Sequence, residues 1–401
     1  MKPVIFSEKK YQNSNIGWHR DGQNVKYFKN NIIKDKKKSK YYYTLSFSYT
    51  FDLSQDTTYF AYSLPYTYSD LNKFLKNLEN NIPNNVQFKR RQLCSTLGQN
   101  QLEYLTITSK KNQDENINDK NINDENEKKG VVFMARQHPG ETTGSFMIEG
   151  VIEFLISENE IASNLRENYV FKIVPMINID GVIHGNNRCS LSGSDLNRKW
   201  GNPDKNLHPE IYYTKQMIHS LNVSHPIQLI IDFHGHSRKQ NAFFYGNNDS
   251  FKPEITKIFP YICSQIENQN NIINFNDSKF KSDLNFKETA RMCLFNELKI
   301  PNVFTLEASF YGYYSKQQQQ NNDFWQKDYN LIGQNVCKAL FCMGQINDYN
   351  LNYVDALKQL NKEQQIDLSG SESDPSGDEL SEKDIKKALN SKQWWQRSQK
   401  Y

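Results

Sequence analysis

The pattern of apolar and polar positions changes twice along the chain. Up to about residue 62, apolar residues alternate with polar ones in short segments, and the segments 41–51 and 57–64 predict strands. No helical period appears before about residue 69, and the basic run "KDKKKSK" (34–40) is typical of a solvated loop. We therefore expect a small β domain over residues 1–62.

From residue 63 to about residue 345 the pattern is that of alternating helices and strands. A helix is predicted within residues 65–82, capped by Ser69 or Asp70, because its leucines and Phe74 share one face. A strand follows at 102–109, and residues 110–129 have only two apolar residues, which predicts a disordered insertion. Further strands are predicted over 131–136, 169–177, 227–233 and 302–308, and further helices over 142–157 and 329–343.

Strands that alternate with helices predict an α/β fold with a mixed, largely parallel sheet and helices on both of its faces. Such a domain would occupy residues 63–345. Residues 346–401 are polar and acidic, and they predict a mostly disordered tail.

Composition and charge exclude several classes of protein. The net charge of +4 is small for 401 residues and gives no indication of a nucleic-acid partner. No apolar run approaches the length of a membrane span, and the N-terminus has no apolar signal core. The six cysteines form no CxxC pair, which argues against a zinc finger and is typical of reduced thiols in the cytosol.

Candidate chemistry lies at the ends of the apolar runs. In an open α/β sheet, ligands bind outside the carboxyl ends of the strands. Four segments place polar residues at such positions; these are His138 and Glu141, then Arg188, Asn197 and Arg198, then His234 and His236, and finally Glu307.

Two histidines and one carboxylate with an open fourth position are the ligand set of a catalytic zinc ion. His138 and Glu141 lie three residues apart in a turn that Pro139 and Gly140 shape, and His234 would complete the set. Taken singly, each of these residues has an ordinary alternative, since an isolated HxxE in a loop is usually structural or surface chemistry. The hypothesis depends on their occurring together in this order.

The remaining polar residues suggest roles in peptide hydrolysis. Glu307 could serve as general base and pass its proton to the leaving amine, although a glutamate at a strand end is usually a solvated charge. Arg188 could stabilise an oxyanion, its alternative being a surface ion pair. Asn197 and Arg198 could bind a free carboxylate.

The sequence resembles the zinc metallocarboxypeptidases, and among them the cytosolic carboxypeptidase family, which removes glutamates from tubulin. The resemblance covers about residues 3–345, and it is carried by "RQHPGETTGSFMIEG", "PMINIDGVIHGNNRCSLSGSDLNRKW", "DFHGHSRKQNAFFYG" and "KETARMCLFNELKIPNVFTLEASFYG". It implies one Zn²⁺ per chain held by His138, Glu141 and His234. It also implies Glu307 as catalytic base, with Arg188, Asn197 and Arg198 as the oxyanion and carboxylate binders.

The resemblance further implies an α/β/α catalytic domain preceded by a β-sandwich domain. That β domain normally begins before the segment "PVIFSEKKYQ", so we expect it to be truncated here. The implied substrates are tubulin or other glutamate-rich protein tails, and we expect a cytoplasmic monomer associated with the cytoskeleton or cilia, without nucleic-acid or membrane partners.

Selectivity for glutamate requires a cation in the side-chain pocket. Arg291 is the candidate, its alternative being a solvated loop charge, and His236 is expected to line the substrate-binding wall rather than bind the metal. A different function also stays open: a truncated β domain is compatible with a non-catalytic protein that binds microtubules or acidic tails.

Overall fold

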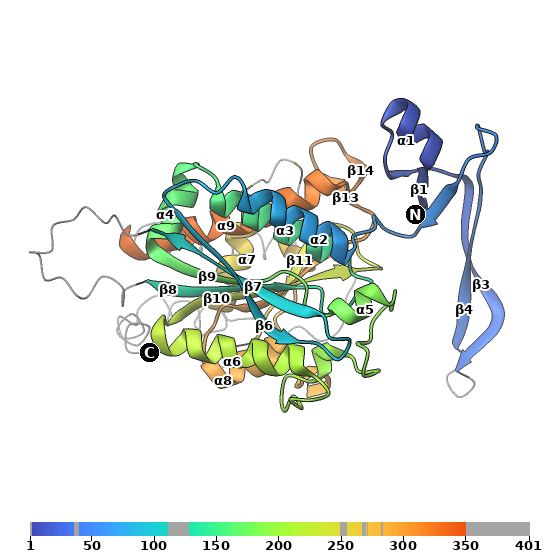
Figure 1. Ribbon diagram of the computed structural model, residues 1–401. Coiled ribbons are helices and arrows are strands. Elements are labelled where there is room, and N and C mark those ends of the chain that lie inside the picture. Colours follow the sequence, from blue (N-terminus) through green and yellow to red (C-terminus); the bar gives the residue numbers. More distant parts are fainter. Residues whose placement is uncertain are drawn as a thin grey trace, which may run out of the picture. The chain divides into compact units, whose positions relative to one another are not determined.

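A seven-stranded mixed sheet forms the centre of the larger of two units in the computed structural model, and this unit comprises residues 67–401 (Figure 1). The smaller unit comprises residues 1–66. The structure describes residues 2–35, 40–110, 128–248, 255–266, 270, 272–281 and 284–349. Nearly all of the predicted insertion (110–129) and most of the tail (346–401) therefore lie outside the described residues.

The sheet has the strand order β11-β12-β10-β8-β9-β7-β6. Its four central strands β12, β10, β8 and β9 are parallel, whereas β11 and β7 each pair antiparallel with their neighbour. The strands are β6 (Val86–Ser95), β7 (Gln101–Ser109), β8 (Lys129–Ala135), β9 (Tyr169–Val174), β10 (Ile227–His236), β11 (Ala242–Tyr245) and β12 (Val303–Ser309). The predicted mixed α/β fold is confirmed.

Helices cover both faces of this sheet. On one face α3 (Thr143–Ile156), α4 (Glu160–Asn168), α7 (Ile255–Ile266) and α9 (Gln326–Tyr349) pack together. On the other face lie α6 (Pro209–Ser224) and α8 (Ala290–Leu298) (Figure 1). Shorter elements are α2 (Tyr68–Glu79), α5 (Ile179–Ile183), the 3-10 turns Leu196–Arg198, Phe275–Asp277 and Leu284–Phe286, and the hairpin of β13 (Gly312–Ser315) and β14 (Gln320–Asp323).

The helix predicted within residues 65–82 is α2, but its cap is different from the predicted one. The Thr67 hydroxyl accepts a hydrogen bond from the Asp70 N–H, and the Asp70 carboxylate accepts one from the Thr67 N–H. This is a reciprocal capping box, in which Asp70 is the third helical residue and not the cap. Leu71 and Leu75 are buried, as the helical period predicted.

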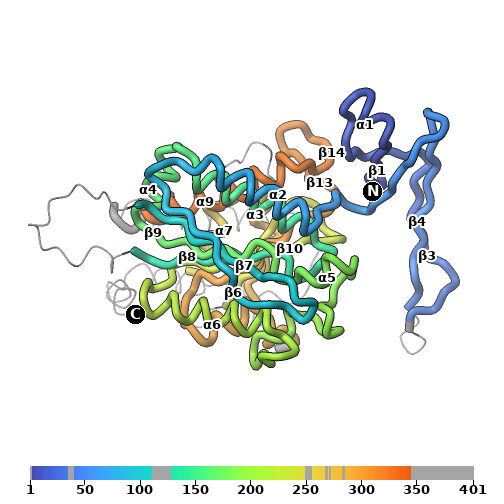
Figure 2. The backbone as a smooth tube through the Cα atoms, in the orientation of Figure 1, coloured from blue at the N-terminus to red at the C-terminus, as the bar shows by residue number. Residues whose placement is uncertain are grey.

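The smaller unit has two antiparallel sheets. The first has the order β2-β1-β5, formed by His19–Arg20, Val4–Ser7 and Thr58–Ala61, and the second is the hairpin of β3 (Gln23–Asp35) and β4 (Lys40–Ser48), which can be traced in Figure 2. The absence of helix before residue 69 is a wrong prediction, because Glu8–Ser14 form α1. Ser7 caps this helix by accepting from the Lys10 N–H, and α1 has no buried residue, so no apolar stripe revealed it.

Helix α3 lies directly against the central strand β10. A Cβ atom at Gly144 would be 2.7 Å from the Phe233 carbonyl oxygen, so only glycine allows this approach. Within the described part of the chain, no helix is both long and apolar enough to cross a membrane.

Candidate metal centre and catalytic site

The turn after β8 is fixed by the buried side chain of Arg136. This residue has a φ of 64°, a left-handed conformation that is costly for a non-glycine residue unless its surroundings impose it. Its Nε donates to the Pro139 carbonyl at 2.9 Å, and its Nη1 donates to the Ser145 Oγ at 2.7 Å. The guanidinium therefore holds the segment from His138 to Glu141 against the start of α3.

His138, Glu141 and His234 converge on one point. Their candidate ligand atoms all lie within 4.8 Å of one another. Glu141 Oε1 is 2.8 Å from His138 Nδ1, and Glu141 Oε2 is 2.8 Å from His234 Nδ1. The two Nδ1 atoms thus face the same carboxylate from segments that are distant in the sequence. Two imidazoles and a carboxylate in this arrangement fit a single catalytic zinc ion.

The opposite nitrogen of each imidazole also has a carboxylate partner. His138 Nε2 is 3.0 Å from Asp195 Oδ1, and His234 Nε2 is 2.5 Å from Asp232 Oδ2. Metal-binding histidines usually donate their second N–H to a carboxylate, which fixes the tautomer and the ring orientation. Both rings are therefore set to offer Nδ1 to a metal, and the residues present fit zinc.

Asp232 is itself held by a buried chain of side chains. Its Oδ2 accepts from the Gln137 Nε2 at 2.5 Å, and the Gln137 Oε1 accepts from the Trp200 indole N–H at 2.8 Å. Asp232, Gln137 and Trp200 are all buried. Sequence reasoning missed this chain, although an aspartate within the apolar run "IQLIIDF" was a signal that could have identified Asp232.

The histidines and the carboxylates of the cluster stabilise one another's charged forms. Burial lowers the pKa of His234, but the charges and hydrogen bonds of Asp232 and Glu141 outweigh it and leave the pKa well above its usual value. Burial opposes the ionised form of Glu141, yet His234 and His138 keep its pKa well below the usual range. Burial also raises the pKa of Asp195, but the hydrogen bond and charge of His138 and the charge of Arg188 outweigh it and lower this pKa to about 2. Both carboxylates are therefore ionised at neutral pH.

Glu307 lies beside this cluster on the neighbouring strand. In the parallel pair of β10 and β12 it is directly opposite His234. Burial raises its pKa to about 7, and the negative charge of Glu141 adds to this, while His234 acts in the opposite direction. A carboxylate with a pKa near neutrality can both accept and return a proton.

The structure places Asn197 beside His234 and connects Arg188 to His138 through Asp195. Arg188 is 46% exposed and pairs through Nε and Nη2 with the Asp195 carboxylate at 2.8 Å, so it is linked to His138 through that aspartate. It also lines a cavity of about 630 Å³, whose other lining residues lie between His184 and Gly193. Asn197 is buried; its Nδ2 is 3.4 Å from His234 Nε2, and its Oδ1 accepts from the Ala290 N–H.

Arg198 and His236 form contacts with residues other than His138, Glu141 and His234. The Arg198 Nη1 donates to the Asn197 carbonyl, and its guanidinium lies 5.2 Å from the centre of the Phe286 ring. His236 ends β10, and its Nδ1 accepts from the backbone N–H groups of Arg238 and Lys239. Its ring packs edge-on against Phe243.

Arg291, predicted as a loop charge or a substrate cation, lies in the first turn of α8 and is only 8% exposed. Its Nη1 donates to the Gly246 carbonyl and, at 2.6 Å, to the Asn247 side chain. Burial lowers its pKa to about 10. The alternative of a solvated loop charge is therefore wrong, because the guanidinium is buried.

Comparison with known proteins agrees with this geometry. The zinc carboxypeptidase family model matches residues 71–331. Cytosolic carboxypeptidase 3 of Mus musculus is 36% identical over 90% of this chain and 34% of its own length, and cytosolic carboxypeptidase 2 of Homo sapiens is 36% identical over 93% and 41%. The chain thus spans about a third of the length of the mouse relative.

Solved structures show the same fold. A metallo-carboxypeptidase from Burkholderia cenocepacia is 20% identical, with a TM-score of 0.64 over 85% of this chain and 80% of its own. A metallo-carboxypeptidase from Pseudomonas aeruginosa is 19% identical, with a TM-score of 0.65 over 86% and 80%. Since the family model covers well over half of its residues and the ligand set is in place, this chain belongs to the zinc carboxypeptidase family.

Proposed function

We propose that this chain is a zinc-dependent carboxypeptidase that removes glutamates, C-terminal or side-chain-linked, from acidic protein tails. The observation that carries the proposal is the placement of Glu307 directly opposite His234, beside two histidine Nδ1 atoms that share the Glu141 carboxylate. A general base next to a metal ligand set is what hydrolysis of a peptide bond needs.

A bound zinc ion would polarise the scissile carbonyl and activate a water molecule. The Glu307 carboxylate would take the proton from that water and deliver it to the nitrogen of the leaving amine. The Arg188 guanidinium would stabilise the negative charge that develops on the carbonyl oxygen. Asp195 and Asp232 would hold the two imidazoles in the orientation observed here throughout the reaction.

Asn197 and Arg198 would bind the free C-terminal carboxylate of the substrate. The position of Asn197 supports this role, because the bond from the Ala290 N–H to its Oδ1 holds the side chain beside His234. Arg198 would supply the positive charge and a planar pair of donors. His236 would contribute to the wall of the same site.

Arg291 would select for glutamate. Burying a cation without a counter-charge is costly, and no carboxylate among the described residues pairs with Arg291. The N–H of its neighbour Ala290 donates a hydrogen bond to Asn197. The charges of Arg291 and Glu307 both act on the pKa of Tyr245, so Tyr245 lies near both. A glutamate side chain bound here would supply the missing negative charge while its α-carboxylate reached Asn197.

The curated relatives are named cytosolic carboxypeptidases, which supports a cytoplasmic location. We extend the proposal to tubulin tails as substrate, to residues 63–345 as the catalytic domain preceded by a β domain at 1–62, and to a monomer near the cytoskeleton or cilia.

Peptides that differ only at the C-terminus test the proposal. We expect rapid hydrolysis of a peptide ending in glutamate, slower hydrolysis of one ending in an apolar residue, and none of the C-terminally amidated form. Equal hydrolysis of the amidated peptide would indicate an amidohydrolase on the same scaffold. Binding of acidic tails without any hydrolysis, by folded and zinc-loaded protein, would favour the non-catalytic alternative.

A further inference from the structure

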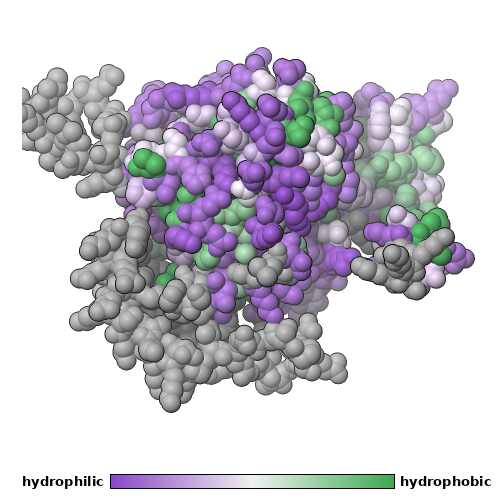
Figure 3. Space-filling model, turned by 90° about the horizontal axis from the view of Figure 1, so that it is seen from below, coloured by the Kyte–Doolittle hydropathy of each residue, from purple (hydrophilic) through white to green (hydrophobic). Residues whose placement is uncertain are grey.

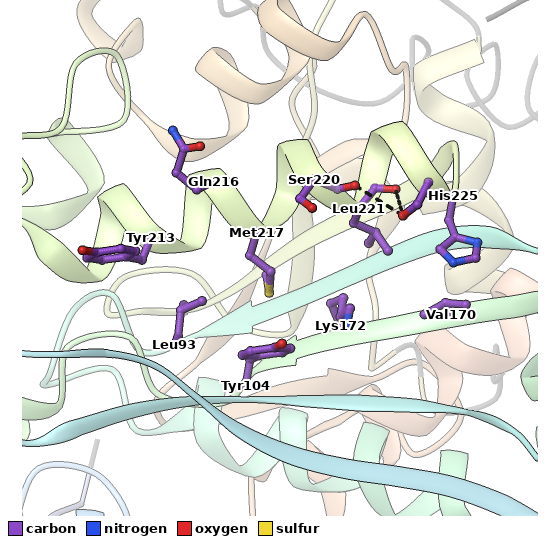
Figure 4. A pocket seen from close by; sticks show the side chains of 11 residues that line it. Leu93, Tyr104, Val170, Lys172, Tyr213, Gln216, Met217, Ser220, Leu221 and His225 are labelled. Carbon is purple, nitrogen blue, oxygen red and sulfur yellow. Dashed lines mark hydrogen bonds between the residues drawn. The ribbon is translucent and has the colours of Figure 1, made fainter.

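A groove separate from the catalytic cluster lies between α6 and the strands β6, β7 and β9. Its volume is about 500 Å³. Met217 of α6 points towards the strands, and Leu93, Tyr104 and Lys172 line the opposite side, whereas Gln216 points away (Figure 4). Figure 3 views the molecule from this side, where hydrophilic side chains predominate. The groove combines an apolar lining with a basic group.

Three cations share this face of the sheet. Lys89 of β6 pairs with Thr106 of β7, and Thr106 pairs with Lys172 of β9, so the two lysines lie in one row across the strands. Arg91 follows Lys89 by two residues and therefore points to the same side. The Lys172 ammonium donates to the Thr106 hydroxyl at 2.8 Å and lies 4.9 Å from the centre of the Tyr104 ring.

These cations have no acidic partner among the residues that the structure describes. Arg90, between Lys89 and Arg91, points to the other face and pairs there with Glu103 at 2.7 Å. On the groove side no carboxylate offsets Lys172; burial, Arg91 and Lys89 together lower its pKa to about 8. Like charges gathered without a counter-ion are unfavourable, and an anionic ligand would relieve the repulsion.

We propose that this groove is a second binding site for the acidic polypeptide whose C-terminal glutamate is removed. This inference rests on the function proposed above. Glutamate carboxylates would contact Lys89, Arg91 and Lys172, and the methylene groups would lie against Leu93 and Met217. Three cations and a net charge of +4 suit a short acidic peptide better than a nucleic acid.

The sheet register sets the length of peptide that can use both sites. Lys172 pairs with Val132 and Val132 with Ile230, and His234 lies four residues beyond Ile230 on β10. With about 3.3 Å per residue along a strand and about 4.8 Å between strands, Lys172 and His234 are roughly 16 Å apart. An extended peptide must therefore be longer than about five residues to reach from one to the other.

The test is direct binding of a fluorescent decaglutamate peptide with an amidated C-terminus, which the catalytic carboxylate clamp does not recognise. Fluorescence anisotropy at low ionic strength is recorded for the native chain and for the variant Lys89→Gln/Arg91→Gln/Lys172→Gln. A charge-matched control is Lys73→Gln/Lys76→Gln/Lys327→Gln, which removes three exposed lysines of α2 and α9. Circular dichroism spectra and zinc content verify that each variant is folded.

We expect the groove variant to bind about tenfold more weakly than the control, with an unchanged rate of hydrolysis of a triglutamate peptide. Equal affinities of the two variants, or no binding by the native chain, would overturn the proposal. So would tighter binding of a single-stranded oligonucleotide through the same three residues. Because the readout is binding, it fails or succeeds separately from the carboxypeptidase activity. If the two variants bound equally well but the chain still released glutamate, only the proposal of a second binding site would be rejected.

Discussion

One carboxylate oxygen of Asp232 accepts a hydrogen bond from Nε2 of His234, which lies two residues further along β10. The two atoms are 2.5 Å apart. The same oxygen accepts from Gln137, which in turn accepts from the Trp200 indole. This buried chain leaves His234 with only Nδ1 directed at the Glu141 carboxylate. The metal ligand is thus oriented by residues that do not touch the metal site themselves.

Replacing Asp232 by Asn should therefore weaken zinc binding. Loss of a carboxylate behind a metal-binding histidine typically costs about 10–100-fold in metal affinity. Competition with a chromogenic chelator measures this directly. Trp200→Phe is the comparison: it removes the N–H that supports Gln137 together with part of a buried ring, but keeps the Asp232 carboxylate, so it should have a smaller effect on zinc affinity in the same direction. Native affinity in Asp232→Asn would show that the carboxylate does not orient His234.

Glu307→Gln should separate metal binding from turnover. The substitution keeps the shape of the side chain and removes the proton acceptor, so we expect about one zinc per chain and a kcat lower by about 10²–10⁴-fold. His138→Ala serves as the comparison, because it should lose zinc as well as activity. Zinc content by atomic absorption and kcat on a glutamate peptide are the two readouts. A fully active Glu307→Gln would mean that another group is the base.

Arg291→Gln should change selectivity more than catalysis. Leaving a buried charge unpaired or removing its partner costs about 2–5 kcal/mol, so kcat/KM for a peptide ending in glutamate should fall by about 30-fold or more. For a peptide ending in leucine the fall should be small. The ratio of the two kcat/KM values is the measurement, and it cancels any loss of active protein. Equal falls for both peptides would contradict the assignment.

Glu210, in the first turn of α6, should make stability depend on pH. Its side chain is buried, its Oε2 has no hydrogen-bond partner, and burial raises the pKa to about 7 from an ordinary value of 4.5. The folded chain then holds a proton that the unfolded chain loses, so stability falls as the pH rises from about 4.5 to about 7. The full loss is about 3 kcal/mol.

Glu210→Gln has no such proton to lose. We expect its melting temperature to equal that of the native chain at pH 4.5 and to exceed it at pH 8. The difference between the two proteins isolates Glu210 from other titrating groups, including the metal ligands. A constant difference across this pH range would show that Glu210 is ionised in the folded state.

The metal ligands could be found from the sequence because they follow apolar runs in motifs of short range. "HPGE" and "DFHGH" place His138, Glu141 and His234 at strand ends, where polar residues are conspicuous. The partners that orient them could not be found in this way. Trp200 meets Gln137 across 63 residues and Gln137 meets Asp232 across 95, and no local pattern records hydrogen bonds formed by the packing of distant segments.

The elements that could not be predicted likewise lack a local apolar pattern. The central strands have apolar runs and were predicted, whereas α1 is held by the Ser7 cap without a buried face, and β6 carries the charged stretch "KRRQ". For Arg291 the sequence left a substrate-binding cation and a solvated loop charge equally open. The packing of α8 against the loop at Gly246 excludes the solvated charge.

The function proposed for the His138, Glu141 and His234 cluster is to bind zinc for the removal of glutamate. The most direct test measures glutamate released from a decaglutamate peptide with zinc, with an excess of chelator, and after zinc is restored. We expect release with zinc, loss of release with chelator and recovery when zinc is restored. Absence of release by folded protein that contains one zinc per chain, or release that the chelator leaves unchanged, would contradict it.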